Sequence, residues 1–427
     1  MKRFAVLLIL LSLFIRPVRP ACAAETVTFW HAMDGSKGET LNRLIDEFNA
    51  THDIKVTGKF VGVSETTQDR YKNSYNVLFK ELLKNVSKGT PPDISQIYEN
   101  WTSQFIMVKA IVPVEDFIAT DSDRQELSDM VPAFLEANKY DGKLWTLPFN
   151  KSIYVLYYNR DMFKQAGLNP PKNWKEMSDI AKKFSKVDKN GNITQWGLSF
   201  KPDVDVFSLV LLSSGEKLFD EHGKPLFNGE GAKKTIKYLR DLINSKGAIM
   251  SFEPQKDFMD GKCAMFLDTS SRIGSLQEQV KFNFSVAPCP SKTSGKILLA
   301  GTNLAMFSTS PEKQKASWEF IKYLTNKENT AKWSMETGYL PVRLSAIQSS
   351  DYQAFVRKNP DNGIGINQLA SGVVAPKVPA WESIRGIMDD TLFDIISNHA
   401  DVNTSLDNAV SLRSEEHTSE LQSRFGI

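Results

Sequence analysis

Residues 27–60 read VTFWHAMDGSKGETLNRLIDEFNATHDIKVTGKF and decide the fold class. The run 27–30 is a short apolar strand, and turn residues follow it. Four apolar residues then recur at helical spacing: Leu41, Leu44, Ile45 and Phe48. Residues 54–60 favour a second strand. A strand, a helix and a strand in direct succession predict a parallel sheet with helices on its faces.

The same alternation continues along the chain. A helical pattern at 75–86 precedes a strand at 93–98, and the segment 147–150 leads into a strand at 154–158. The next helix begins near 159–161. The chain has 427 residues, too many for one ordinary domain, and it contains neither an internal repeat nor a low-complexity linker. We therefore predict an α/β protein of two lobes that exchange strands several times.

The first 23 residues have the pattern of a secretory signal peptide. Lys2 and Arg3 precede an apolar run at 4–15, and small residues at 21–23 offer a cleavage site. Arg19 lies where a lipoprotein signal needs an aliphatic residue, which argues against lipidation at the following cysteine. No other run approaches the ~20 apolar residues of a membrane span, so we expect a secreted protein that does not cross the membrane.

The net charge changes sign when the signal peptide is set aside. The chain has 52 basic and 50 acidic residues. Four of the basic residues lie in or beside the signal: Lys2, Arg3, Arg16 and Arg19. Their removal leaves 48 basic against 50 acidic residues, a net charge of −2. Such a surface gives no electrostatic reason to bind nucleic acid or anionic lipid.

Cys263 and Cys289 are the two cysteines of the mature chain. In an oxidising compartment they could form a disulfide. However, Cys263 opens one predicted strand and Cys289 closes the next. If these strands are parallel, the two residues lie at opposite ends of them. We expect two small buried residues without a bridge.

Five motifs resemble those of one protein family. In order they are FWHAMDG at 29–35, QIYE at 96–99, LPFN at 147–150, VLYYN at 155–159 and TGYLP at 337–341. Together they look like the extracellular solute-binding proteins of carbohydrate-type ABC importers. Within that group they are most similar to the periplasmic glycerol-3-phosphate-binding proteins. The resemblance covers roughly residues 27–410.

The resemblance implies a two-lobed periplasmic binding protein. The N-lobe would comprise 25–149 and 291–336, and the C-lobe 150–290 and 337–412. The ligand would lie between the lobes, at the strand ends. The implied partners are a small phosphoglycerol ligand and the membrane subunits of an ABC importer. We expect a monomer in the periplasm that needs neither metal nor cofactor.

The resemblance also implies a binding site made of seven widely spaced residues. These are Tyr75, Glu99, Ser152, Ser270, Gly301, Tyr339 and Arg385. Arg385 would clamp the phosphate, because a guanidinium donates two parallel hydrogen bonds to phosphate oxygens. Glu99 would accept hydrogen bonds from the polyol hydroxyls. It would face away from Arg385, since a carboxylate repels phosphate.

Most of these residues also have a structural interpretation. Ser270 follows an apolar strand and is placed like an ordinary helix N-cap, with Thr269 as the substitute if the alignment is one residue off. Gly301 is either a loop glycine or a close approach of ligand to backbone. Isolated tyrosines are more often core residues, and a lone arginine on a helix is usually solvated.

One segment departs from the family pattern. Where relatives carry a Gly-Trp-x-Gly-Trp motif whose indoles wall the ligand, this chain has FKPDVD at 200–205. The missing indoles would widen the cleft, and Asp203 or Asp205 could meet a cation on the ligand. This departure favours a glycerophosphodiester such as glycerophosphocholine over free glycerol-3-phosphate.

Two alternatives remain open. A binding protein for a neutral sugar or oligosaccharide would share the fold and most of the motifs. A secreted phosphodiesterase would need a metal cluster or a nucleophile–base pair, yet the five histidines form no close metal-ligand pair, and no Gly-x-Ser-x-Gly or phosphate-loop motif occurs. We therefore expect a protein that is not an enzyme. Residues 413–427 look like a non-native tail.

Overall fold

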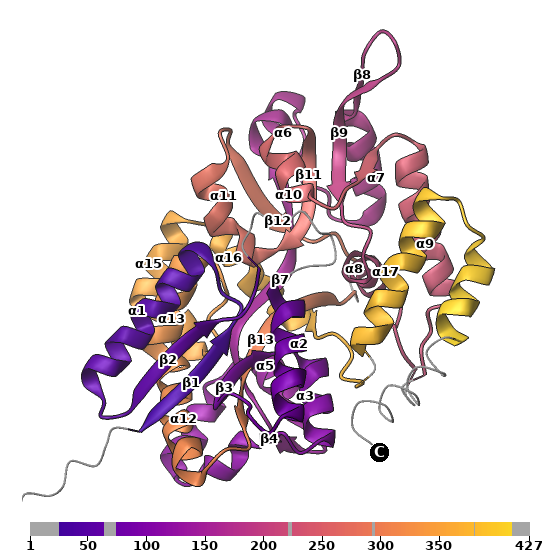
Figure 1. Ribbon diagram of the computed structural model, residues 1–427. Helices are drawn as coiled ribbons and strands as arrows, with labels where there is room; N and C mark the ends of the chain where they lie inside the picture. The colour runs from indigo at the N-terminus through magenta and orange to yellow at the C-terminus, as the bar shows by residue number, and fades with distance from the viewer. Residues whose placement is uncertain (1–24, 64–73, 221–223, 293–294, 380, 412–427) are drawn as a thin grey trace, which may run out of the picture.

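The computed structural model describes residues 25–63, 74–220, 224–292, 295–379 and 381–411. The predicted signal peptide and the suspected non-native tail lie outside these residues. Figure 1 shows two bodies, one holding the N-terminal strands and the other holding most of the middle of the chain, with two long strands running between them. The predicted two-lobed α/β fold is confirmed.

The opening strand, helix and strand are as predicted. They are β1 (Thr26–His31), α1 (Gly35–Thr51) and β2 (Lys55–Phe60). β1 and β2 pair in parallel, in a register that runs from Thr26 opposite Lys55 to His31 opposite Phe60. The helix buries the apolar residues whose spacing predicted it, which are Leu41, Leu44, Ile45 and Phe48.

The N-lobe continues with short elements on both faces of this sheet. They are α2 (Ser74–Ser87), β3 (Ile94–Ile97), α3 (Glu99–Met107), β4 (Ile111–Val112), η1 (Val114–Phe117), α4 (Asp121–Ser128), α5 (Pro132–Ala137), β5 (Lys139–Tyr140) and β6 (Lys143–Leu144). β3 pairs in parallel with β1, and β4 pairs with the end of a later strand. The N-lobe core lies on either side of these strands.

The C-lobe sheet forms from the middle of the chain. Its elements are β7 (Leu147–Asn159), α6 (Arg160–Ala166), α7 (Trp174–Phe184), β8 (Lys186–Val187), β9 (Ile193–Phe200), α8 (Val204–Ser213), α9 (Glu230–Asn244), β10 (Ala248–Met250), α10 (Pro254–Met259), β11 (Cys263–Thr269), η2 (Ser270–Arg272), α11 (Ile273–Gln279) and β12 (Phe284–Pro288). β7 lies between β11 and β12 and is antiparallel to both.

The last third of the chain contributes to both lobes. It comprises β13 (Ile297–Phe307), α12 (Pro311–Leu324), α13 (Lys327–Thr337), α14 (Leu344–Ile347), α15 (Ser350–Lys358), α16 (Asp361–Gln368), η3 (Leu369–Ser371), β14 (Gly372–Val373) and α17 (Trp381–Ser397). α12 packs on β1, whereas α17 packs on α8 and α9 of the C-lobe. A further helix occupies 402–411.

Strands β7 and β13 join the lobes. β13 pairs with β3 of the N-lobe through Asn303–Met306, and with β7 from Leu299 to Leu304, on both sides of a register shift beside Gly301. The far half of β7 then pairs with β11 and β12 of the C-lobe. Side chains of Ile297, Leu298 and Leu299 lie in the C-lobe core. The strands therefore change lobes near 150 and 301, whereas the predicted division at 149, 290 and 336 stays a prediction.

Gly301 marks the crossing of these two strands. Its φ is +97°, and the register between β13 and β7 shifts next to it. A Cβ at this position would lie 1.9 Å from the carbonyl oxygen of Asn150. Only glycine fits here, because both the backbone conformation and the space exclude a side chain.

The two cysteines are free and buried, as the sequence predicted. Cys263 is the first residue of β11, and Cys289 follows β12. Because both strands are antiparallel to β7, they run parallel to each other, so the two thiols sit toward opposite ends. Burial raises the pKa of both thiols above its ordinary range.

Candidate functional site

The site predicted from the sequence lies where the lobes meet. Glu99 begins α3 directly after β3, and Ser152 lies on β7 beside the crossing with β13. Ser270 begins η2 at the end of β11. Tyr339 lies in the loop after α13, and Arg385 lies in the second turn of α17. These elements come from both lobes, so the described structure collects residues that are up to 310 positions apart in the sequence.

Glu99 has a partner that the sequence did not reveal. The Lys151 ammonium lies 2.5 Å from Oε1 of Glu99, and the two side chains are 1% and 6% exposed. The same ammonium is 3.4 Å from the carbonyl oxygen of Gly301. Burial lowers the pKa of Lys151, while the nearby carboxylate of Glu99 opposes that change. A charge-balanced pair thus occupies the strand crossing.

Asn150 connects the two long strands to the N-lobe. Its Oδ1 accepts hydrogen bonds from Gln96 Nε2 at 3.0 Å and from Thr302 Oγ1 at 2.5 Å. Its Nδ2 donates to the hydroxyl of Tyr75 at 3.2 Å. Gln96 in turn accepts from the backbone N–H of Ala32 at 2.9 Å. This buried network fixes the Tyr75 hydroxyl relative to β7, as a preorganised site requires.

Aromatic rings line the N-lobe side of the site. The rings of Tyr75 and Tyr98 are 5.0 Å apart, and Tyr98 contacts Trp101 edge-to-face at 4.9 Å. Tyr339 stacks on Trp333 at 5.8 Å, and the Lys37 ammonium lies 5.1 Å from the Tyr339 ring centre. Burial and then the neighbouring Tyr339 raise the pKa of Tyr75 well above 10, so its hydroxyl is a neutral hydrogen-bond donor.

Arg385 forms a bidentate ion pair with Asp205. One guanidinium nitrogen lies 2.5 Å from Oδ1 and the other lies 2.9 Å from Oδ2. The side chains are 28% and 24% exposed, so the pair is within reach of a ligand. Burial alone would raise the pKa of Asp205, but the Arg385 guanidinium outweighs that effect and holds this pKa below its ordinary value. Asp205, predicted as a possible contact for a ligand cation, is therefore already engaged.

Two more carboxylates surround this pair. Asp203 caps α8, accepting a hydrogen bond from the N–H of Val206 at 2.9 Å, and Asp389 on α17 accepts from the N–H of Val204 at 2.7 Å. Burial raises the pKa of Asp203 to about 6, with Lys201 opposing the shift. Burial and then the charge of Asp203 raise the pKa of Asp389 to about 7. The FKPDVD segment thus places two aspartates, Asp203 and Asp205, at the start of α8. The family pattern has tryptophans there.

Ser152 and Ser270, two further residues of the predicted site, are both buried. Ser152 pairs with Ala300 across the β7–β13 ladder. The hydroxyl oxygen of Ser270 accepts a weak 3.4 Å hydrogen bond from the N–H of Ile153. Ser270 is the first residue of η2 and is 1% exposed, while Thr269 precedes it as the cap residue. Their role in ligand binding stays a prediction, as it does for all seven residues.

Glu382 is a second residue that the sequence analysis missed. Its Oε2 accepts hydrogen bonds from Nδ2 of Asn100 at 2.9 Å and from the indole N–H of Trp101 at 3.2 Å. Asn100 and Trp101 lie on α3 of the N-lobe, whereas Glu382 lies on α17, three residues before Arg385. This contact links α17 to α3 and so connects the two lobes.

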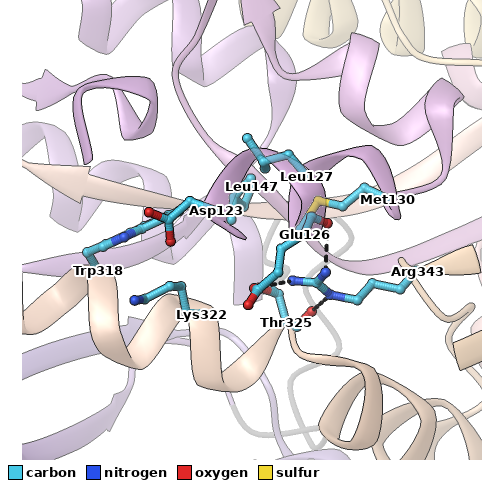
Figure 2. Close-up of a pocket in the computed structure, with 9 residues that line it drawn as sticks. All are labelled: Asp123, Glu126, Leu127, Met130, Leu147, Trp318, Lys322, Thr325 and Arg343. Carbon is cyan, nitrogen blue, oxygen red and sulfur yellow. Dashed lines mark hydrogen bonds and ion pairs between the residues drawn. The ribbon is translucent and has the colours of Figure 1, made fainter. Parts of the chain in front are cut away.

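A separate small hollow lies within the N-lobe. Figure 2 shows Asp123, Glu126, Lys322 and Arg343 around it. Arg343 donates to the carbonyl oxygen of Glu126 at 2.7 Å and also bonds the carbonyl of Thr325, so it ties α4 to α12. The hollow has a volume of about 10 Å³, which is room for about one water. We therefore read it as structural.

Two features are absent from the residues that the structure describes. No group of three or more His, Cys, Asp or Glu side chains there is arranged to hold a metal ion. Over the same part of the chain, none of the helices combines the length and apolar character that crossing a membrane requires.

Comparison with known families identifies the class of protein. A model of the bacterial extracellular solute-binding protein family matches residues 43–360. The chain therefore belongs to the bacterial extracellular solute-binding proteins.

Particular relatives agree with the motifs that suggested the family. The sn-glycerol-3-phosphate-binding periplasmic protein UgpB of Pectobacterium atrosepticum is 30% identical over 414 residues, covering 91% of this chain and 90% of its own. UgpB of Escherichia coli K12 is 29% identical over 415 residues, with 91% and 92% covered. The resemblance to glycerol-3-phosphate-binding periplasmic proteins is thus confirmed.

Solved structures share the fold. UgpB of Mycobacterium tuberculosis in complex with glycerophosphocholine superposes with a TM-score of 0.78 at 20% identity, covering 92% of this chain and all of its own. The GacH receptor of Streptomyces glaucescens, solved unliganded and with acarbose, gives 0.78 at 21% identity, with 92% and 98% covered. One ligand is a phosphodiester and the other an oligosaccharide, so the fold alone does not choose between them.

Proposed function

We propose that this protein is a periplasmic receptor that captures glycerol-3-phosphate or a glycerophosphodiester between its lobes and delivers it to the membrane subunits of an ABC importer. Relatives about 30% identical over nine-tenths of the chain bear the name of a glycerol-3-phosphate-binding protein. The ligand-binding residues are Tyr75, Glu99, Ser152, Ser270, Gly301, Tyr339 and Arg385. The receptor acts as a monomer and is exported by its signal peptide.

The observation that carries the proposal is the arrangement of charged side chains where the lobes meet. Arg385 is half-buried on the C-lobe side, while the Glu99–Lys151 pair lies at the strand crossing. A phosphate suits the guanidinium end, since Arg385 keeps donors that Asp205 does not use. Vicinal hydroxyls suit the other end, because the pair offers a carboxylate to accept hydrogen bonds and an ammonium to donate them.

The proposal assigns no catalytic step to these residues. His31, which lies within the FWHAMDG motif, is buried, and burial lowers its pKa to about 4; its Nδ1 accepts a 3.3 Å hydrogen bond from the N–H of Met33. Because that N–H occupies the Nδ1 lone pair, the proton of the neutral ring lies on Nε2, and the ring has no free lone pair with which to activate a nucleophile. Incubation with glycerophosphocholine should release no choline, and steady release would favour the phosphodiesterase alternative.

A thermal-shift panel tests the proposal. Glycerol-3-phosphate and glycerophosphocholine should raise the melting temperature, because a ligand that binds only the folded state stabilises it by mass action. Glycerol, inorganic phosphate and maltose at the same concentration should give smaller shifts. A shift with maltose alone would favour the binding protein for a neutral sugar or oligosaccharide.

A further inference from the structure

The ion pair of Arg385 and Asp205 gives the phosphate end of the cleft no net positive charge. Both carboxylate oxygens of Asp205 are held by the guanidinium, at 2.5 and 2.9 Å. The side chain of Arg385 is nevertheless 28% exposed, and a guanidinium has five N–H donors. A ligand oxyanion can therefore hydrogen-bond to Arg385, but it must do so beside a carboxylate.

Other charged and titratable groups face Asp205 from each element around it. Asp203 and Lys201 flank it on its own segment, and Lys201 lies 3.9 Å from Asp203. From α17, Asp389 lies close enough for its charge to act on both Asp205 and Arg385, and the charge of Glu382 acts on Arg385. The phenols of Tyr98 and Tyr154 complete the set, and the charge of Asp205 helps to raise the pKa of both. When all of the carboxylates are ionised, this group has four negative charges and two positive charges. The positive charges are those of Lys201 and Arg385.

The excess of negative charge affects the binding free energy of a ligand according to the charge of that ligand. A phosphodiester carries one negative charge throughout the physiological pH range. A phosphomonoester carries nearly two at neutral pH, because its second pKa is about 6. Repulsion from Asp205 grows with the charge of the ligand, and the cost of removing an ion from water grows with its square. The free-energy cost of placing the phosphate beside Asp205 is therefore larger for the monoester than for the diester.

We propose that Asp205 is a specificity-determining residue that makes this cleft select a monoanionic glycerophosphodiester over dianionic glycerol-3-phosphate. This inference rests on the proposed function and assigns its ligand class. It differs from the expectation that Asp205 contacts a cation on the ligand, because the selection acts on the phosphate group and needs no positively charged headgroup.

The test compares glycerol-3-phosphate with glycerophosphoglycerol, a diester whose headgroup is uncharged. Calorimetric titration at pH 8 and pH 5, at one ionic strength, gives the ratio of the two dissociation constants. We expect the preference for the diester to be at least about tenfold greater at pH 8, where the monoester is a dianion. Asp203 and Asp389 take up protons over the same interval, and their neutralisation acts in the same direction.

Asp205→Asn separates Asp205 from these neighbours. At pH 8 the variant should bind the monoester more tightly and lower the preference for the diester about tenfold. Asp241→Asn, which makes the same charge change on the exposed face of α9, should leave the ratio unchanged. Should Asp205→Asn fold poorly, Asp205→Ser removes the same charge with a smaller side chain, and its ratio at pH 8 is judged in the same way.

Three outcomes would overturn the inference. A wild-type preference that is the same at both pH values, or equal ratios in wild type and Asp205→Asn, would leave phosphoglycerol binding intact and remove Asp205 as its selector. Failure of the wild-type protein to bind either ligand would instead overturn the proposed function, and this inference with it.

Discussion

The ammonium of Lys151 lies 2.5 Å from a carboxylate oxygen of Glu99, and both side chains are almost completely buried at the point where the two lobes exchange strands. Neither charge would be stable there alone, because desolvating a single ion costs several kcal/mol. The pair therefore couples the integrity of the strand crossing to the polar end of the proposed site.

Lys151→Met should destabilise the protein by about 3–5 kcal/mol, because it leaves the Glu99 carboxylate buried without its partner. Chemical denaturation measures the change. The double variant Lys151→Met with Glu99→Gln should recover part of the loss. Lys175→Met, which breaks an exposed pair with Asp179, should cost no more than about 1 kcal/mol. Equal losses of stability in Lys151→Met and Lys175→Met would show that the buried pair of Lys151 and Glu99 does not stabilise the fold more than an exposed pair does.

Gly301→Ala should lower the free energy of unfolding by about 3 kcal/mol or more. The new methyl group would meet the carbonyl oxygen of Asn150, and the φ of +97° is strained for alanine. Gly142→Ala is the matched control, since its φ is +78° but no atom lies within 4 Å of the added carbon, and it should cost about 1 kcal/mol. Similar costs at the two sites would contradict a tight strand crossing.

His31 should make stability depend on pH between about 6.5 and 4. In the unfolded chain this imidazole binds a proton near 6.5, whereas burial in the folded protein lowers its pKa to about 4. Its contribution is therefore complete above pH 6.5 and is lost as the pH falls toward 4, by about 3 kcal/mol. Denaturation midpoints over this range should fall less steeply in His31→Gln. The same dependence of the midpoint on pH in wild type and His31→Gln would mean that His31 does not contribute to the pH dependence of stability.

Glu382→Ala should favour separation of the lobes. The substitution removes the acceptor shared by Asn100 and Trp101, so the ligand-free protein should show a larger radius of gyration in small-angle scattering. Ligand should restore the compact form at an affinity reduced about tenfold, the worth of one charge-assisted hydrogen bond. Glu278→Ala on the exposed face of α11 should match wild type. An unchanged radius in Glu382→Ala would mean that this contact does not hold the lobes together.

Local patterns in the sequence predicted the secondary structure well. Apolar spacing in 41–48 predicted α1. Asn159 is the N-cap residue of α6, and Gly167 is its C-cap residue. β7 begins earlier than expected, at Leu147, because the LPFN segment is itself strand and is buried. Such features depend on residues a few positions apart, which is why one sequence can reveal them.

Pairings between distant residues could not be predicted in this way. Lys151 and Glu99 are 52 positions apart, and Arg385 and Asp205 are 180 apart. Nothing in the pattern around Lys151 distinguishes it from a surface lysine, apart from its place in an apolar strand. Family resemblance suggested Glu99 and Arg385 as ligand contacts, but it did not give their partners Lys151 and Asp205, which lie on other elements of the fold.

Calorimetric titration of wild type and Arg385→Ala with glycerol-3-phosphate and glycerophosphocholine tests the central claim most directly. If Arg385 binds the phosphate, the variant should fold normally and lose about 2–5 kcal/mol of binding free energy for each ligand. Affinity for both ligands equal to that of wild type would remove Arg385 from the site and contradict the proposed receptor for phosphoglycerol ligands.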